Sequence, residues 1–122
     1  MPTDSAWRVV YYEREDGKYP VVNFLDGLNR QERARALAAI DLLEEEGPNL
    51  RRPYADYLKD GIYELRVRVS KARYRIFYFF HDGQNIVLTH GFKKKVRQVP
   101  QTEINRARRY KEDWLGRDHE DS

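Results

Sequence analysis

At 122 residues and a net charge of +3, the chain is long enough for one domain that buries about two thirds of its unfolded surface, and a second domain would not fit. A content of 40% apolar residues excludes a disordered chain in spite of 35% charged residues, and the absence of cysteine excludes disulfides and thiolate metal sites. Because it has neither a signal-peptide core nor an apolar run long enough to span a bilayer, the protein is expected to be cytoplasmic, with no membrane partner. No cofactor or metal is expected either.

The first part of the chain predicts one strand followed by two helices. Residues 7–13 are an aromatic and β-branched run that is typical of a strand. Pro20 suits the first turn of a short helix, because the N–H that proline lacks would have no partner there. Asn29 and Glu32 have the spacing of a capping box at the start of a second helix, which Gly47 ends.

The second part predicts a loop over residues 48–61, and then three strands and a helix over residues 62–69, 73–80 and 86–93 and from Pro100 onward. The order β-α-α-β-β-β-α is an α+β fold, in which two helices cover one face of a small, mainly antiparallel sheet and leave the other face less covered. One domain is expected over residues 1–117, with an acidic, frayed tail over residues 118–122.

Period-two alternation gathers charged side chains on the less covered face of this sheet. In the first of the three strands, apolar side chains alternate with Glu64, Arg66 and Arg68, so these three are expected to point away from the helices. The hairpin should place Arg73 and Arg75 beside them on the next strand. The result is a carboxylate among guanidinium groups, whose forks of donors fit phosphate oxygens.

The third of these strands is predicted to add Lys93 to the same face, together with Thr89 and Gly91. His90 falls in phase with the apolar residues of the strand, which are Ile86, Leu88 and Phe92. A core or edge histidine bonded to a neighbour is therefore favoured over a catalytic general acid, although its ordinary pKa near neutrality keeps the second interpretation open.

A carboxylate within a field of positive charge can support RNA cleavage without a metal. When the RNA 2′-hydroxyl is the nucleophile, the reaction needs a proton acceptor near the 2′-oxygen, a proton donor near the leaving 5′-oxygen, and positive charge between them. Glu64 is the leading candidate for the acceptor, and Lys93 or Lys94 could assist the leaving group. The alternative is that Glu64 only forms a cross-strand ion pair with a neighbouring arginine.

Positive charge is also concentrated toward the C-terminus, where residues 93–111 hold eight Lys or Arg and one acid. Such a basic face attracts phosphates, although a solvated surface has the same composition. Tyr110 and Trp114 could stack on a base, but their helical spacing favours packing of the last helix. The residues expected to contact RNA are Arg68, Arg73, Lys94, Lys95 and Arg97.

Three segments carry a pattern that is known from other proteins: Tyr63-Glu64-Leu65-Arg66, Tyr74-Arg75-Ile76-Phe77-Tyr78 and His90-Gly91-Phe92-Lys93-Lys94-Lys95. Their order and spacing resemble the RelE/HigB toxin superfamily, and most closely the phage-derived Gp49-like HigB branch of type II toxin–antitoxin systems. The resemblance covers about residues 7–114. It implies a RelE/ParE-like fold, an mRNA endonuclease that acts in the ribosomal A site, and inhibition by a cognate helix-turn-helix antitoxin.

The resemblance also implies roles for single residues. Arg66 and Arg75 match basic residues that stabilise the scissile phosphate, and Lys93 matches a residue with a leaving-group role. Glu64 stands where the archetypal toxin carries lysine, although some relatives use a glutamate. No tyrosine lies between residues 96 and 101 to stack beneath a base of the message. Either Tyr110, Phe92 or a ribosomal nucleotide takes that role, or the activity is reduced.

The favoured interpretation is a ribosome-dependent mRNA interferase that inhibits translation by transesterification through the RNA 2′-hydroxyl. Its catalytic residues would be Glu64, Arg66, Arg75 and Lys93. Two alternatives share the fold, because fold does not settle the reaction. One is a ParE-like toxin that inhibits gyrase, and the other is a non-catalytic module that binds RNA or the ribosome. The oligomeric state is left open, with a heterotetramer with the antitoxin as one possibility.

Overall fold

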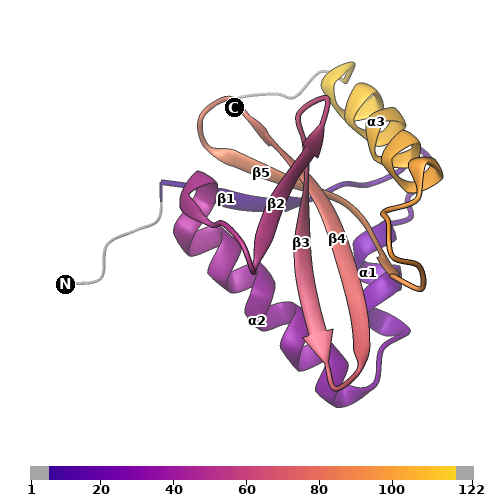
Figure 1. Ribbon diagram of the computed structural model, residues 1–122. Helices are drawn as coiled ribbons and strands as arrows, with labels where there is room; N and C mark the ends of the chain where they lie inside the picture. Colours follow the sequence, from indigo (N-terminus) through magenta and orange to yellow (C-terminus); the bar gives the residue numbers. More distant parts are fainter. Residues whose placement is uncertain (1–5, 118–122) are drawn as a thin grey trace.

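The computed structural model describes residues 6–117, and a five-stranded sheet with the order β1-β5-β4-β3-β2 forms its centre (Figure 1). The strands are β1 (Arg8–Tyr11), β2 (Ala55–Lys59), β3 (Ile62–Val69), β4 (Ala72–His81) and β5 (Asn85–Lys93). The helices are α1 (Pro20–Asp26), α2 (Arg30–Glu46), the 3-10 turn η1 (Gly47–Asn49) and α3 (Gln101–Leu115). Strand β1 runs parallel to β5, and the other pairs are antiparallel. The tail predicted at residues 118–122 lies outside the described residues.

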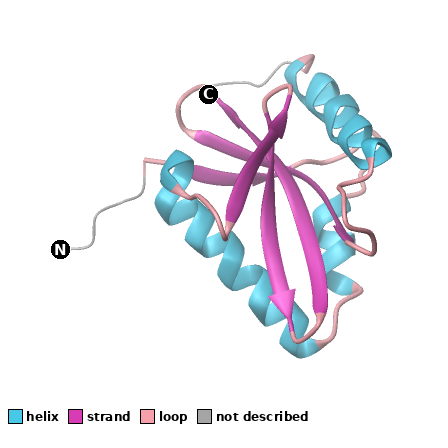
Figure 2. Cartoon of the chain, in the orientation of Figure 1, coloured by secondary structure: helices cyan, strands magenta, loops and turns pink. Residues whose placement is uncertain are grey.

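Helices cover the two faces of the sheet unequally (Figure 2). Helices α1 and α2 pack on one face, where Ile40 and Leu43 of α2 join a core cluster with Leu65 and Ile76 of the sheet. Helix α3 packs on the other face over a second cluster that contains Phe77, and it leaves the end of the β3–β4 hairpin open. The predicted α+β fold with two N-terminal helices on one face is therefore confirmed. No helix within residues 6–117 is long and apolar enough to cross a bilayer.

The predicted capping box begins α2 and also ties this helix to the sheet. The Asn29 side chain accepts a hydrogen bond from the backbone N–H of Glu32 at 2.8 Å, and the Asn29 N–H donates to the Glu32 carboxylate at 2.9 Å. The other oxygen of that carboxylate accepts from the Tyr74 hydroxyl of β4. One acidic side chain thus caps the helix and fixes its first turn against the sheet.

The prediction of a loop over residues 48–61 is wrong for β2. This short edge strand pairs antiparallel with β3, and Ala55 lies opposite Leu65. Two prolines before it and three charged or polar side chains within it hid the strand signal. One more backbone hydrogen bond extends this pairing, from the N–H of Arg66 to the oxygen of Tyr54, the residue before β2, at 2.8 Å. Because β2 begins only at Ala55, the outer edge of β3 beyond Arg66 is not covered by a strand.

Strand β5 contains a β-bulge at Thr89, and this bulge reverses which face of the sheet the side chains after it point to. Phe77 of β4 pairs with His90 and the next residue, Tyr78, pairs with Leu88, so Thr89 is an additional residue on β5. An additional residue in one strand turns every following side chain to the opposite face of the sheet. The predicted alternation therefore holds up to Leu88 and is wrong beyond it.

The side chains after the bulge show this reversal. The rings of His90 and Phe92 contact Phe77 on the α3 face, whereas Gly91 faces Phe24 of α1. The structure thus contradicts the prediction that His90 and Phe92 share a face with Ile86 and Leu88, which belong to the core beneath α1 and α2. It contradicts equally the prediction that Gly91 lies on the face of the cations.

We predict that Gly91→Ala destabilises the protein through this close approach of β5 to α1. A Cβ at Gly91 would lie 2.5 Å from the Phe24 ring, so strand or helix must shift, at a cost of about 1–3 kcal/mol in the free energy of unfolding. Gly27→Ala is the matched control, because a Cβ there meets its nearest atom at 3.6 Å, and we expect a change within about 0.5 kcal/mol. Urea denaturation of both variants measures the difference, and equal midpoints would contradict the packing described here.

Candidate active site

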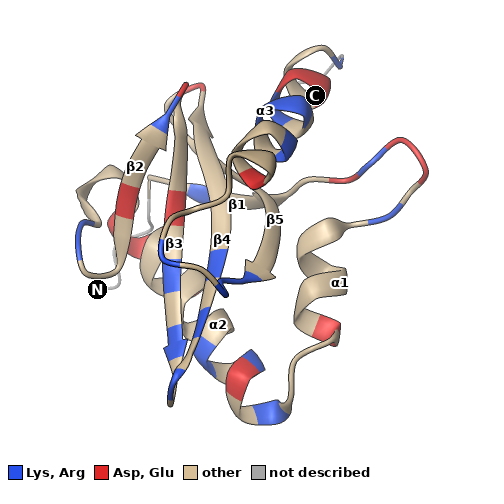
Figure 3. Cartoon of the chain, turned by 45° about the vertical axis from the view of Figure 1, so that its right-hand side comes forward, with Lys and Arg blue, Asp and Glu red and all other residues tan. Residues whose placement is uncertain are grey.

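Lys and Arg residues recur along β3, β4 and the segment that follows β5 (Figure 3). They line a groove of about 710 Å³ that continues around the edge of β3 toward α2. The predicted residues in its lining are Arg66, Arg68, Arg73, Arg75 and Lys94. Strand pairing explains why they meet, because Arg66 lies opposite Arg75 and Arg68 lies opposite Arg73.

Glu64 lies at the centre of these cations, as the alternation predicted. Its Oε1 accepts from the Nε of Arg75 at 3.1 Å and its Oε2 accepts from the Nε of Arg66 at 3.0 Å. The carboxylate is buried, with an exposed fraction of 2%. The cross-strand ion pair with Arg75 is thus present and buried, and a second, partly exposed ion pair joins Arg66 to the same carboxylate.

This carboxylate offsets a repulsion that the strand register creates. Like charges directly opposite each other in a sheet destabilise it, and Arg66 and Arg75 are such a pair. Glu64 is two residues from Arg66 and on the same face, so its two oxygens can reach both guanidiniums. Arg66 also lies 3.5 Å from Asp56 of β2, which holds it at the groove's rim.

Arg75 is the more deeply buried of the two arginines. Burial lowers the pKa of its guanidinium, Arg66 lowers it further, and Glu64 acts in the opposite direction. One Nη also donates to the backbone oxygen of Tyr74 at 3.1 Å. This guanidinium is therefore held in a fixed orientation before any ligand arrives, which is what electrostatic stabilisation of a transition state requires.

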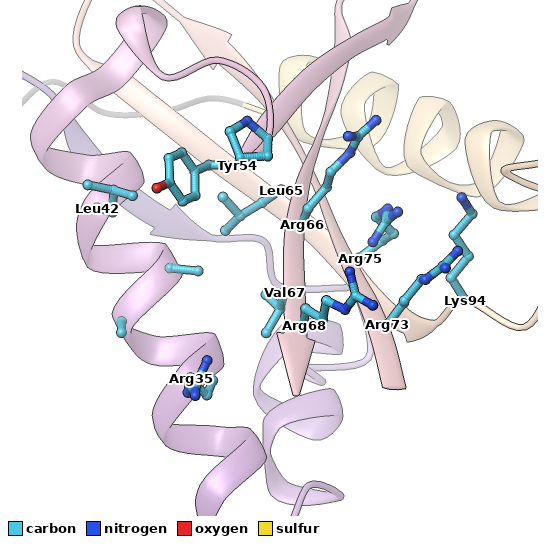
Figure 4. A pocket seen from close by; sticks show the side chains of 13 residues that line it. Arg35, Leu42, Tyr54, Leu65, Arg66, Val67, Arg68, Arg73, Arg75 and Lys94 are labelled. Carbon is cyan, nitrogen blue, oxygen red and sulfur yellow. The ribbon is translucent and has the colours of Figure 1, made fainter. Parts of the chain in front are cut away.

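Lys94 completes the cluster from the segment after β5. Its backbone N–H donates to the oxygen of Arg73 at 2.8 Å, which continues the pairing with β4 by one residue. Its side chain lines the groove together with those of Arg73 and Arg75 (Figure 4). Burial lowers the pKa of Lys94, and the charge of Arg75 lowers it further. A lysine with a lowered pKa gives up its proton more readily than an exposed one, which suits a general acid.

The structure does not bring Lys93 into this cluster. Lys93 lies opposite Tyr74, whose ring belongs to the core beneath α1 and α2, so its side chain is on the other face of the sheet. Its charge acts there on Glu32 at the start of α2, whose pKa is lowered mainly by the hydrogen bond from Tyr74 and to a smaller extent by Lys93. The prediction that Lys93 shares a face with Glu64 is therefore wrong, and the bulge at Thr89 is the reason.

Four other predicted residues lie outside the groove. Lys95 and Arg97 are exposed in the segment between β5 and α3 and do not line the groove. Tyr110 and Trp114 pack α3 against the sheet, as their spacing indicated. The Tyr110 ring stacks on Tyr12 at 4.7 Å, and Trp114 is buried.

His90 is a buried core residue, which confirms the favoured interpretation of it. Its Nε2 lies 3.0 Å from a carboxylate oxygen of Glu103 on α3, and its Nδ1 lies 3.1 Å from the Thr89 hydroxyl. Burial lowers the pKa of His90 to about 3, and the charges of Arg106 and Arg109 act in the same direction. A neutral ring that donates from Nε2 to Glu103 satisfies this site, and it cannot supply protons near neutral pH.

Sequence reasoning missed the part of the groove between α2 and β3, which includes Tyr54 and Arg35. Tyr54 precedes β2 and is 54% exposed, and Arg35 comes from α2. Their sequence signal is weak, because only the fold brings α2 and the start of β2 beside β3. Phe92, one of the predicted stacking candidates, lies directly opposite Arg75 on the α3 face. Within residues 6–117 no group of three or more His, Asp or Glu could hold a metal ion.

Comparisons with known proteins agree with the motifs of the sequence. Residues 23–112 match the family described as "Phage derived protein Gp49-like (DUF891)". The chain belongs to this family. It is also 32% identical over 96 residues to "Putative toxin HigB3" of Mycobacterium tuberculosis (strain ATCC 25618 / H37Rv). The aligned region covers 75% of this chain and 84% of that protein. Both findings make this Gp49-like chain a member of the HigB/RelE-type toxins, and they support a role in a toxin–antitoxin system.

We predict that the burial of His90 makes stability depend on pH. As pH falls below the ordinary value of 6.5, the unfolded chain binds a proton on His90 that the folded protein does not bind until about pH 3. Folding stability is therefore lost over this window, by at most about 1.4 kcal/mol per pH unit from this group. Urea unfolding from pH 7 to pH 4 should show a smaller loss for His90→Gln than for the wild type. Equal losses, or a histidine NMR signal for residue 90 that titrates near pH 6.5, would contradict the assignment.

Proposed function

We propose that this protein is the toxin of a type II toxin–antitoxin system and that it cleaves messenger RNA on the ribosome. The observation that carries the proposal is that Arg66 and Arg75 bond to one buried carboxylate and line, with Lys94, a groove on the open part of the sheet. Membership of the HigB/RelE-type toxins supports the same reaction class. Because translating ribosomes are the proposed target, the toxin would act in the cytoplasm.

The proposed reaction is a transesterification within the RNA. The 2′-oxygen attacks the adjacent phosphorus, the bond to the 5′-oxygen breaks, and the products are a cyclic phosphate and a 5′-hydroxyl. Arg66 and Arg75 stabilise the extra negative charge of the pentacovalent phosphate. Lys94 takes the leaving-group role for which Lys93 was predicted, and it donates its proton to the 5′-oxygen.

Glu64 is the proposed acceptor for the proton of the 2′-hydroxyl. In the free protein its Oε2 is bonded to Arg66, the more exposed of the two arginines. A phosphate in the groove competes for the Arg66 guanidinium, and turning this side chain toward the phosphate leaves Oε2 available. Arg75 continues to hold Oε1, so the carboxylate keeps its place during proton transfer.

The antitoxin is the proposed partner that inhibits this activity. A groove with six Lys or Arg and no Asp or Glu in its lining attracts acidic ligands, and a helix-turn-helix antitoxin could cover it or hold the toxin off the ribosome. Arg68 and Arg73 at the hairpin end and the exposed Lys95 and Arg97 are the proposed further contacts to mRNA or ribosomal RNA.

We predict that Lys94→Met slows cleavage by about 10²- to 10⁴-fold, because it removes the proton donor. Lys93→Met is the matched control, since it removes the same charge one residue away on the other face, and it should cut at nearly the wild-type rate. The measurement is primer extension on a message translated in vitro with each variant. Equal loss in both variants would contradict the assignment of Lys94. Intact messages together with DNA damage in cells would favour the gyrase-inhibiting alternative.

We predict that Glu64→Gln, which keeps the side-chain shape and removes the proton acceptor, also slows cleavage by about 10²- to 10⁴-fold. Asp56→Asn is the control, because Asp56 is the other carboxylate that contacts Arg66 and it has no role in proton transfer. Circular dichroism must first establish that Glu64→Gln is folded, since breaking a buried ion pair costs about 3–5 kcal/mol. A folded Glu64→Gln protein that cuts at the wild-type rate would limit Glu64 to positioning the arginines.

A further inference from the structure

The groove has a second half that the proposed reaction does not use. On the α2 side of β3, the rings and methyl groups of Tyr54, Leu42, Leu65 and Val67 line an apolar slot between the helix and the strand (Figure 4). Leu65 and Val67 are buried and form its floor. Tyr54 stands at its side with 54% of its surface exposed, which is unusual for a large ring beside an apolar slot.

The slot and the cationic cluster belong to one continuous groove because the edge of β3 is open between them. Neighbouring side chains in a strand point to opposite faces, so Val67 lies in the slot while Arg66 and Arg68 lie in the cluster. Strand β2 covers β3 only as far as the bond between Arg66 and Tyr54. A flexible chain can therefore cross the edge of the sheet here and contact both halves.

The chemistry of the two halves fits a single-stranded nucleic acid. Such a chain carries a phosphate and a flat aromatic base in each nucleotide, and proteins bind it by combining a basic groove with exposed aromatic side chains on which bases stack. We propose that the slot binds a nucleobase stacked on Tyr54, from a nucleotide that neighbours the phosphate held by Arg66 and Arg75. The inference rests on the proposed function, and it adds a path for the RNA around the edge of β3.

An extended acidic peptide is the other ligand that such an edge could accept, because an open strand edge can pair with an added strand. The exposed tyrosine favours the nucleic acid. A peptide strand added along β3 would be held by backbone bonds and would need no aromatic platform, whereas a base needs one. Arg35 on the α2 side extends the positive charge past the slot, which suits a backbone that stays anionic along its whole length.

The test uses 2′-O-methyl RNA of about ten nucleotides, which lacks the nucleophile and is not cleaved, and the same backbone without bases. Fluorescence anisotropy should show that Tyr54→Ser weakens binding of the RNA by about 5- to 150-fold, since stacking contributes about 1–3 kcal/mol per base. Tyr54→Phe should bind like the wild type, because it keeps the ring. Tyr57→Ser is the matched control, as Tyr57 is equally exposed at 52% but lies outside the groove.

Binding of the backbone without bases separates stacking from charge. Wild type and Tyr54→Ser should bind it equally, and a loss of the same size with and without bases would overturn the inference. Unchanged RNA binding by Tyr54→Ser would overturn it too. If Tyr54→Ser weakens only the binding of a synthetic peptide of alternating Glu and Leu, the slot is a strand-docking site and the inference fails.

The ribosome assay keeps this inference apart from the proposed function. If the wild type leaves translated messages intact, the proposed function fails, whatever the oligonucleotides show. If the wild type cuts and Tyr54→Ser cuts at the same sites with the same dependence on toxin concentration, the function stands and the base slot is overturned. A shift to higher toxin concentrations or to other cleavage sites in Tyr54→Ser supports the slot.

Discussion

The site depends on one buried carboxylate between two guanidiniums. Arg66 and Arg75 lie opposite each other in adjacent strands, an arrangement that would push the strands apart without a negative charge between them. Glu64 supplies that charge from within β3 and accepts one bond from each arginine. The ion pair is costly to desolvate, so its contribution is to orientation more than to stability. It holds the Arg75 guanidinium in one orientation, and a phosphodiester that enters the groove has only to draw Arg66 away from the carboxylate.

A second constraint decides which lysine joins the arginines. The bulge at Thr89 turns the end of β5 over, so Lys94 is directed toward the arginines and Lys93 toward the start of α2. Bulges often lie beside active sites, where they redirect a side chain. The same bulge places His90 beneath α3 and lets Gly91 lie against Phe24 of α1. One additional residue therefore sets both the composition of the site and the packing of two helices.

Local patterns were sufficient to predict much of the fold and the centre of the site. The alternation from Tyr63 to Val69 and the hairpin after it placed Glu64, Arg66 and Arg75 together, and Asn29 with Glu32 marked the start of α2. A bulge has no comparable signal, because the residues around Thr89 alternate in the sequence as they would in a regular strand. Strand β2 and Tyr54 were missed for another reason. Their environment is created by β3 and α2, which are distant in sequence and become neighbours only in the fold.

Two buried titratable side chains on the same face show how the protein separates packing from chemistry. Glu64, Phe77 and His90 form one row across β3, β4 and β5, and Arg66, Arg75 and Phe92 form the next. At one end of the first row His90 lies under α3, where burial favours the neutral ring. At the other end Glu64 faces the arginines. Phe77 is fully buried between them, and it keeps the dry contact beneath α3 apart from the charged cluster. Helix α3 leaves the end of the β3–β4 hairpin open, so the groove beside Glu64 presents the charges of Arg66, Arg68 and Arg73 to a ligand.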